Sequence, residues 1–103
     1  MLEKVVELVK KHPKISDFHL RSECAFSYRL LGEIQSIAGN IVKKEQIEEI
    51  LNKYCSNDDL DRLNAKNELD SGFTVENLRF RANFYKTLTG PALVLRKIET
   101  TIL

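Results

Sequence analysis

Glycine and proline are scarce in this 103-residue chain, which has four glycines and two prolines. Neither G-x-x-x-x-G-K-[ST] nor G-x-G-x-x-G occurs in it. Both patterns supply the backbone amides that wrap phosphate groups, so no loop of the chain is expected to do this. The chain is therefore not expected to hold and hydrolyse a nucleotide by itself.

Long apolar runs and net charge are also lacking. No apolar segment approaches the ~20 residues that a membrane-spanning helix needs. Lys+Arg total 16 and Asp+Glu total 15, a formal charge of +1, so the chain has no broad positive field for nucleic acid or for an anionic membrane. Any site for an anion must be local.

The only cysteines are Cys24 and Cys55. They form no C-x-x-C pair and have no histidine at metal-ligand spacing, which argues against a zinc site. Two thiols without a signal peptide favour the reduced state and a cytoplasmic location. Cys24 lies in a predicted turn, but no neighbouring charge in the sequence indicates an activated thiolate.

The remaining composition is that of one folded domain. Hydrophobic residues make up 43% of the chain and charged residues 30%, which is typical of a globular protein with a single core. Apolar residues at helical spacing predict a helix before Pro13, and a second from about residue 43 to 54. Ser56 followed by Asp59 predicts the cap of a third, short helix.

Alternating residues predict strands. In "SDFHL" (16–20), Ser16 shares a face with Phe18 and Leu20, whereas Asp17 and His19 share the opposite face with Arg21. A second strand follows across a hairpin turn at residues 22–25; it has Phe26, Tyr28 and Leu30 on one face, has Ser27 and Arg29 on the other, and ends at Gly32.

A third predicted strand begins near Asp70, and its pairing with the next can be derived. A two-residue turn at Glu76-Asn77 places Phe73 opposite Phe80 and Gly72 opposite Arg81, so that every apolar residue falls on one face. The turn after this strand is open to two interpretations. A four-residue loop at 88–91 places Asn83 opposite Arg96, and five residues would move Arg96 to the other face.

With the four-residue loop, three arginines share one face: Arg79, Arg81 and Arg96. Either they are solvated and neutralised by Glu68, Asp70 and Glu99, or they bind a phosphate or carboxylate, for which the planar guanidinium is well suited. Asp17 and His19 are open to two interpretations as well. They are a structural hydrogen-bonded pair at the sheet edge or part of an acid–base site, although no nucleophile accompanies them. The element order, with two strands before and three after the central helices, predicts an α+β fold: an antiparallel sheet with helices packed on one face.

In this order, the motifs resemble the N-terminal domain of the type II/IV secretion superfamily ATPases, nearest the type IV pilus retraction (twitching motility) ATPase. The resemblance rests on "SDFHL" (16–20), "YRLLGEI" (28–34), "ELDSGF" (68–73), "RFRANFY" (79–85) and "ALVLRKI" (92–98). It implies a PAS-like domain over residues 1–103, which precedes a RecA-like ATPase domain that is absent from this chain.

The resemblance further implies a function. ATP would lie between the two domains, with Mg²⁺ held by the ATPase domain, and Arg81 and Arg96, with Arg79 as a third, would reach its phosphates. The partners would be the chain's own ATPase domain, neighbouring subunits of a homohexamer, and pilus or secretion machinery at the inner membrane, but no nucleic acid. The alternatives are a free-standing PAS-like sensor or interaction module, and a small enzyme that uses Asp17 and His19.

Overall fold

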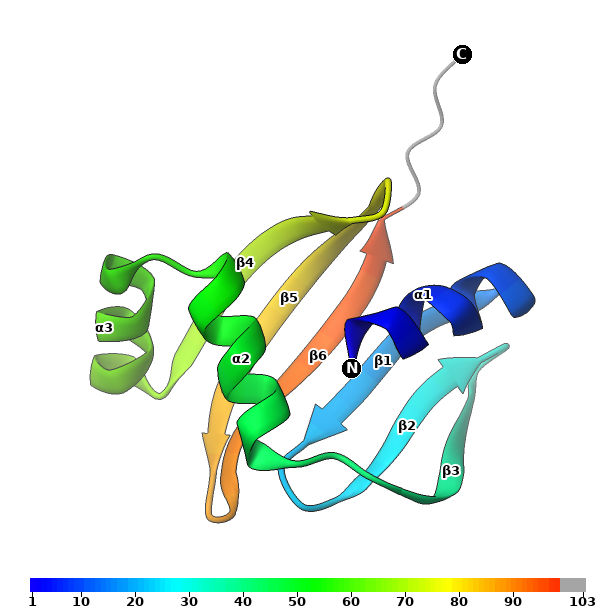
Figure 1. The fold of residues 1–103 in the computed structure, drawn as a ribbon, viewed down its shortest axis with the longest axis horizontal. Helices are drawn as coiled ribbons and strands as arrows, with labels where there is room; N and C mark the ends of the chain where they lie inside the picture. The colour runs from blue at the N-terminus through cyan, green and yellow to red at the C-terminus, as the bar shows by residue number, and fades with distance from the viewer. Residues whose placement is uncertain (99–103) are drawn as a thin grey trace.

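The computed structural model of the protein describes residues 1–98. This range contains three helices and six strands, and Figure 1 shows their arrangement. Their bounds are α1 Leu2–Lys11, β1 Ile15–Arg21, β2 Ala25–Leu30, β3 Glu33–Ile41, α2 Lys44–Tyr54, α3 Asn57–Lys66, β4 Glu68–Val75, β5 Leu78–Thr87 and β6 Gly90–Ile98. All three predicted helices are confirmed, including the Ser56 cap, whose Oγ accepts from the amide of Asp59 at 3.1 Å.

The six strands form one antiparallel sheet in the order β3-β2-β1-β6-β5-β4. Figure 1 shows α1 and α2 in front of the sheet and α3 beside β4. The helices thus cover one face of the sheet, and the α+β prediction is confirmed. We call the other face, which no helix of the described residues covers, the open face. None of the helices in residues 1–98 has the length and apolar character needed to span a bilayer.

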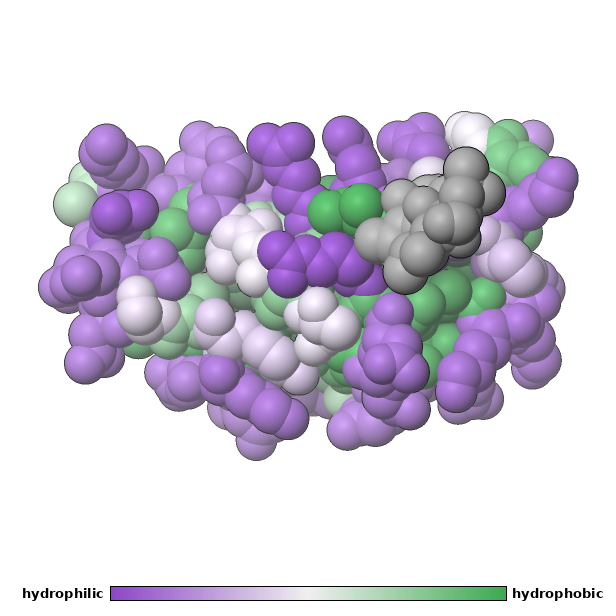
Figure 2. Space-filling view, turned by 90° about the horizontal axis from the view of Figure 1, so that it is seen from above, coloured by the Kyte–Doolittle hydropathy of each residue, from purple (hydrophilic) through white to green (hydrophobic). Residues whose placement is uncertain are grey.

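The core lies between the helices and the sheet. Val5 and Val9 of α1 and Ile47 and Ile50 of α2 pack against apolar side chains that alternate along the strands. The strand residues of this apolar core cluster are Ile15, Phe18, Leu20, Phe26, Leu69, Phe73, Phe80, Ala82, Phe84, Leu93 and Leu95. In Figure 2 apolar residues show in a middle layer, with hydrophilic side chains projecting above and below it.

One strand, β3, is not among the elements predicted from the sequence. The predicted chain order has two strands before the central helices, but the structure has three. Leu31 and Gly32 both have positive φ, 51° and 83°, and form a two-residue turn, so that the chain reverses after Gly32 and continues as a strand. β3 lies at the edge of the sheet and is mostly exposed. A strand of this kind lacks the apolar alternation that predicts strands from sequence.

In the two C-terminal hairpins, the predicted register of β4 and β5 is confirmed and the predicted loop between β5 and β6 is corrected. β4 and β5 pair as derived, with Phe73 opposite Phe80 and Gly72 opposite Arg81. The loop between β5 and β6 is shorter than expected: Thr87 pairs with Gly90, which leaves a two-residue turn and makes Pro91 the second residue of β6. Arg96 therefore lies opposite Arg81 and not opposite Asn83. The shift is by two residues, so Arg96 keeps its predicted face.

Ser16 is a second correction. It does not share the apolar face with Phe18, because a β-bulge inserts it between Ile15 and Asp17, which pair with the adjacent residues Leu30 and Arg29. Ile15 is buried and Ser16 is exposed. The bulge turns Asp17 to the open face while Ile15 stays in the core.

Candidate anion-binding face

Arginine side chains gather on the open face of the sheet. The chain has six arginines, and all but Arg62 of α3 lie in strands. Those five are Arg21 of β1, Arg29 of β2, Arg79 and Arg81 of β5, and Arg96 of β6. The strand registers place each of them on the face opposite the core. Of the predicted site residues, Arg79, Arg81 and Arg96 thus share one face, as the sequence analysis expected.

Arg81 and Arg96 lie directly opposite each other on β5 and β6. Like charges in this position repel each other and destabilise the pairing of the strands. The two residues line a depression of about 230 Å³, together with Asp70, Asn83 and Val94. Arg79 lies two residues before Arg81 on β5 and pairs with Ile98 of β6. Its Nη1 donates to Thr74 Oγ1 at 3.4 Å.

The carboxylates expected to neutralise these arginines are engaged elsewhere. Asn83 Nδ2 donates to Asp70 Oδ1 at 2.9 Å and to Glu68 Oε1 at 3.2 Å. Within residues 1–98, no carboxylate oxygen lies within 4.0 Å of the guanidinium nitrogens of Arg79, Arg81 or Arg96. Glu99 lies outside the described residues. The two facing guanidiniums therefore have no ion pair in this part of the chain.

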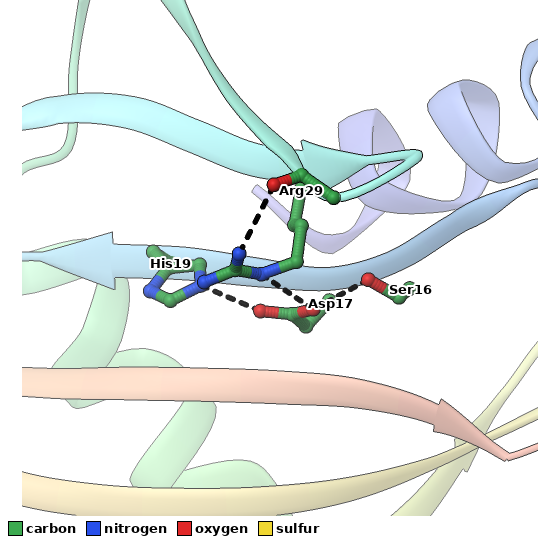
Figure 3. A network of polar contacts seen from close by, with 5 residues as sticks. Ser16, Asp17, His19 and Arg29 are labelled. Atoms are coloured by element: carbon green, nitrogen blue, oxygen red, sulfur yellow. Dashed lines mark hydrogen bonds and ion pairs between the residues drawn. The ribbon is translucent and has the colours of Figure 1, made fainter.

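Asp17 lies at the centre of a second polar cluster on the open face, shown in Figure 3. Its Oδ1 accepts from Ser16 Oγ at 2.6 Å, its Oδ2 accepts from His19 Nε2 at 2.6 Å, and Arg29 Nε lies 3.6 Å from Oδ1. The predicted pairing of Asp17 with His19 is confirmed. Its predicted place at the sheet edge is wrong, because β1 is the third of the six strands.

The environment of Asp17 lowers its pKa below the ordinary value. Burial raises the pKa, but the hydrogen bonds from Ser16 and His19 and the electrostatic interactions with His19 and Arg29 outweigh that effect. Asp17 is only 7% exposed although it belongs to the open face. The carboxyl is thus held as a buried, ionised acceptor. The one hydroxyl bonded to it, Ser16 Oγ, donates to Asp17 itself, while His19 binds the other carboxylate oxygen, so the bonds do not form a Ser–His–Asp relay.

Sequence reasoning missed the contact between Arg29 and Asp17. It placed both residues away from the core but took the first hairpin turn as residues 22–25. The turn is residues 22–24, and this odd length sets the register that places His19 opposite Ser27 and Asp17 opposite Arg29. The bulge at Ser16 shifts only the next pair, Ile15 with Leu30. An odd loop length leaves no clear mark in the sequence.

A further depression of about 360 Å³ lies beside this cluster on the open face. Its walls are His19, Arg21, Ser27, Arg29, Ile34 and Tyr85. The open face therefore carries cationic side chains over most of its width, from β2 to β5. Both cysteines are free: Cys24 lies in the first turn, and burial raises the pKa of the Cys55 thiol, with help from Asp59.

Comparison with solved structures shows where this architecture occurs. The pilus retraction motor PilT bound to ADP superposes on 96% of this chain with a TM-score of 0.76 at 23% identity. The ATPase DotB of Legionella pneumophila superposes on 97% with a TM-score of 0.78 at 17% identity, and DotB of Yersinia pseudotuberculosis on 94% with 0.72 at 19%.

The chain shares its fold with a part of these ATPases. It spans 30% of the length of PilT and 29% of each DotB. The resemblance drawn from the sequence motifs is confirmed at the level of the fold. No protein-family model matches the chain, and none of the curated proteins does either.

Proposed function

We propose that this chain is the N-terminal domain of a hexameric motor ATPase of a type IV pilus or type II secretion system. In this role Arg81 and Arg96, with Arg79 as a third contact, bind the phosphates of ATP that is held by a RecA-like ATPase domain. The observation that carries the proposal is the pair of facing guanidiniums, which has no carboxylate partner within residues 1–98.

The chemistry of that pair fits a polyphosphate. Two cations held opposite each other on neighbouring strands repel, and a bound anion removes the repulsion. Each guanidinium has donors in a planar fork that matches phosphate oxygens. Because the chain has no phosphate-wrapping loop, these side chains would supply only one side of the site. The ATPase domain would supply the other side and would hold Mg²⁺.

The geometry also supports a role in the motor cycle. Strands β5 and β6 are inner strands of the sheet, so the arginines sit on a rigid support and reach a nucleotide only when the two domains close. The negative charge of the γ-phosphate favours the closed arrangement. Its loss on hydrolysis weakens the contact and releases the domain to rotate. In a ring, this rotation would be passed to the neighbouring subunit.

The location follows from the proposal. Such a motor works in the cytoplasm and binds the inner-membrane part of a pilus or secretion machine. The partners of this domain are then its own ATPase domain, the adjacent subunits of the homohexamer and that machinery. A net charge of +1 supports a local phosphate contact over the binding of nucleic acid.

The test is ATP turnover in the full-length parent protein. We expect Arg81→Ala and Arg96→Ala each to lower kcat on the order of 100-fold, because each removes a cation from the transferring phosphate. Arg79→Ala should have a smaller effect. The matched control is Arg62→Ala, which removes the same charge from an exposed position of α3 and should leave turnover unchanged.

Wild-type turnover in both the Arg81 and Arg96 variants would refute the proposal, provided that each variant keeps the thermal unfolding midpoint of the wild type. The reading frame downstream of residue 103 is an independent test. A phosphate-binding loop there supports the motor, and a stop codon supports the free-standing sensor.

A further inference from the structure

Asp17 and Arg96 are direct neighbours across strands β1 and β6. Opposite charges in this position attract and commonly form an ion pair. Here they do not, because no Asp17 oxygen lies within 4.0 Å of the Arg96 guanidinium. Asp17 also has the least exposed carboxylate of the open face. A potential counter-ion of Arg96 is thus present on the neighbouring strand but paired with other groups.

The groups that engage Asp17 come from β1 and β2. Ser16 and His19 bind its two oxygens at 2.6 Å each, and Arg29 reaches across from β2 with Nε 3.6 Å from Oδ1. Arg29 is itself oriented by a bond from Nη1 to the carbonyl of Gly32 at 3.4 Å. Together the three groups engage both oxygens of the carboxylate, which leaves fewer acceptor positions for Arg96.

The bulge at Ser16 accounts for one of these contacts. It adds one residue to β1 and so brings the Ser16 hydroxyl beside the carboxylate of the next residue. A buried carboxylate needs such partners, because an unpaired charge in this environment is costly. Without them, we expect Asp17 to pair with Arg96, the cation directly opposite it on β6.

We propose that Ser16, His19 and Arg29 are positioning residues, which hold the Asp17 carboxylate and so keep the Arg96 guanidinium available for an external phosphate. This inference rests on the proposed function, since it assigns a role only if Arg96 binds phosphate. The inference predicts that loss of the Arg29 cation weakens anion binding mainly because Asp17 is then free to pair with Arg96.

The experiment titrates the 103-residue chain with inorganic triphosphate and follows the Nε–H resonance of Arg96 by NMR. Arg29→Ala should weaken binding about three- to five-fold, the effect of one competing ion pair near a surface, and should shift the Arg96 resonance before any ligand is added. The matched control is Arg21→Ala. It removes an arginine from the same face that does not contact Asp17, and it should change affinity and resonance much less.

A double variant separates positioning from loss of charge. Asp17→Asn should improve triphosphate binding more in the Arg29→Ala background than in the wild type, and it should return the Arg96 resonance toward the wild-type position. His19→Ala should also weaken triphosphate binding and shift the Arg96 resonance. Asp17→Asn should reverse both effects in that background. The thermal unfolding midpoint of each variant is measured to show that the variant is folded under the conditions of the titration.

Failure of the positioning role can be distinguished from failure of the proposed function. If Arg29→Ala and Arg21→Ala weaken binding equally, and Asp17→Asn gives the same gain in both backgrounds, the positioning role is overturned while the proposed function stands. If Arg96→Ala binds triphosphate as well as the wild type does, Arg96 is no phosphate contact and the proposed function itself falls.

Discussion

At the scale of single residues, arginine and lysine occupy different places in this molecule. Five arginines lie on the open face, whereas the strand lysines, Lys86 and Lys97, belong to the helix-covered side. Lys86 lines a cavity of about 630 Å³ with residues of α2 and α3, and Lys97 donates to the carbonyl of Pro13. Arginine binds planar anions with several donors at once, and lysine acts as a point charge. The segregation therefore supports an anion-binding role for the open face.

Asp17 gives a prediction on pH and stability. Its pKa is lower in the folded protein than in the unfolded chain, so its pairing stabilises the fold above the unfolded pKa. That stabilisation is lost as the pH falls through the folded pKa. We expect Asp17→Asn to lower the free energy of unfolding at pH 7 by about 1–3 kcal/mol, the range for a hydrogen-bonded charge, and to reduce the loss of stability between neutral and acid pH.

Urea unfolding at a series of pH values measures this difference. Asp61→Asn is the matched control, because Asp61 is exposed on α3 and the substitution should leave the stability at neutral pH unchanged. Parallel pH curves for the wild type and Asp17→Asn would show that the Asp17 cluster contributes nothing to stability.

At the scale of the elements, the sequence predicts those segments whose burial alternates. The register of β4 and β5 follows from Phe73 and Phe80, because a slip of one residue would bury Arg81. β3 has no such pattern, and Pro91 suggested a loop although it lies in β6. The face shared by the arginines was thus predictable, because side chains alternate between the two faces along each strand. The contact between Arg29 and Asp17 was not, because it depends on the three-residue length of the turn between β1 and β2.

The turn between β4 and β5 gives an element-scale prediction. Glu76 and Asn77 both have left-handed φ, 45° and 70°, a conformation that is unfavourable for glutamate and is best met by Asn-Gly. Replacing Glu76-Asn77 by Asn-Gly should raise the free energy of unfolding by about 1 kcal/mol. Chemical denaturation of the two proteins measures the gain.

The β5–β6 turn is the matched control. Its residues Leu88 and Thr89 do not have positive φ, and the Thr89 hydroxyl donates to the carbonyl of Ser22 at 2.9 Å. The same Asn-Gly replacement there should lower stability. A gain of equal size at both turns would mean that the effect does not come from the left-handed conformation of Glu76 and Asn77.

At the scale of the whole molecule, the two faces of the sheet differ in what can pack on them. Helices cover one face, and the other presents five arginines with few carboxylates between them. Two copies that stacked through their open faces would bring like charges together, which disfavours such a dimer. The open face is therefore better suited to an anionic ligand or an acidic surface than to a second copy of the chain.

Self-association of the chain in solution can be predicted from its surfaces. We expect the 103-residue chain to sediment as a monomer of about 11.9 kDa, because the ring contacts in our proposal are made to an ATPase domain that these residues do not contain. The competing route is pairing of β3 edges, where Ile34 and Ile41 are 50% and 42% exposed. Gly39, with φ of 77°, lies within an irregularity of β3 that works against a regular edge-to-edge ladder.

Analytical ultracentrifugation over a range of concentrations separates these outcomes. A dimer that Ile34→Lys dissociates would show that β3 edges pair in spite of the irregularity. A stable hexamer of these residues alone would be more serious, because it would place the ring-forming surface within this domain. The closing motion that brings Arg81 and Arg96 to the nucleotide would then have to occur within a fixed ring, and the rotation argued from the open face would lose its basis.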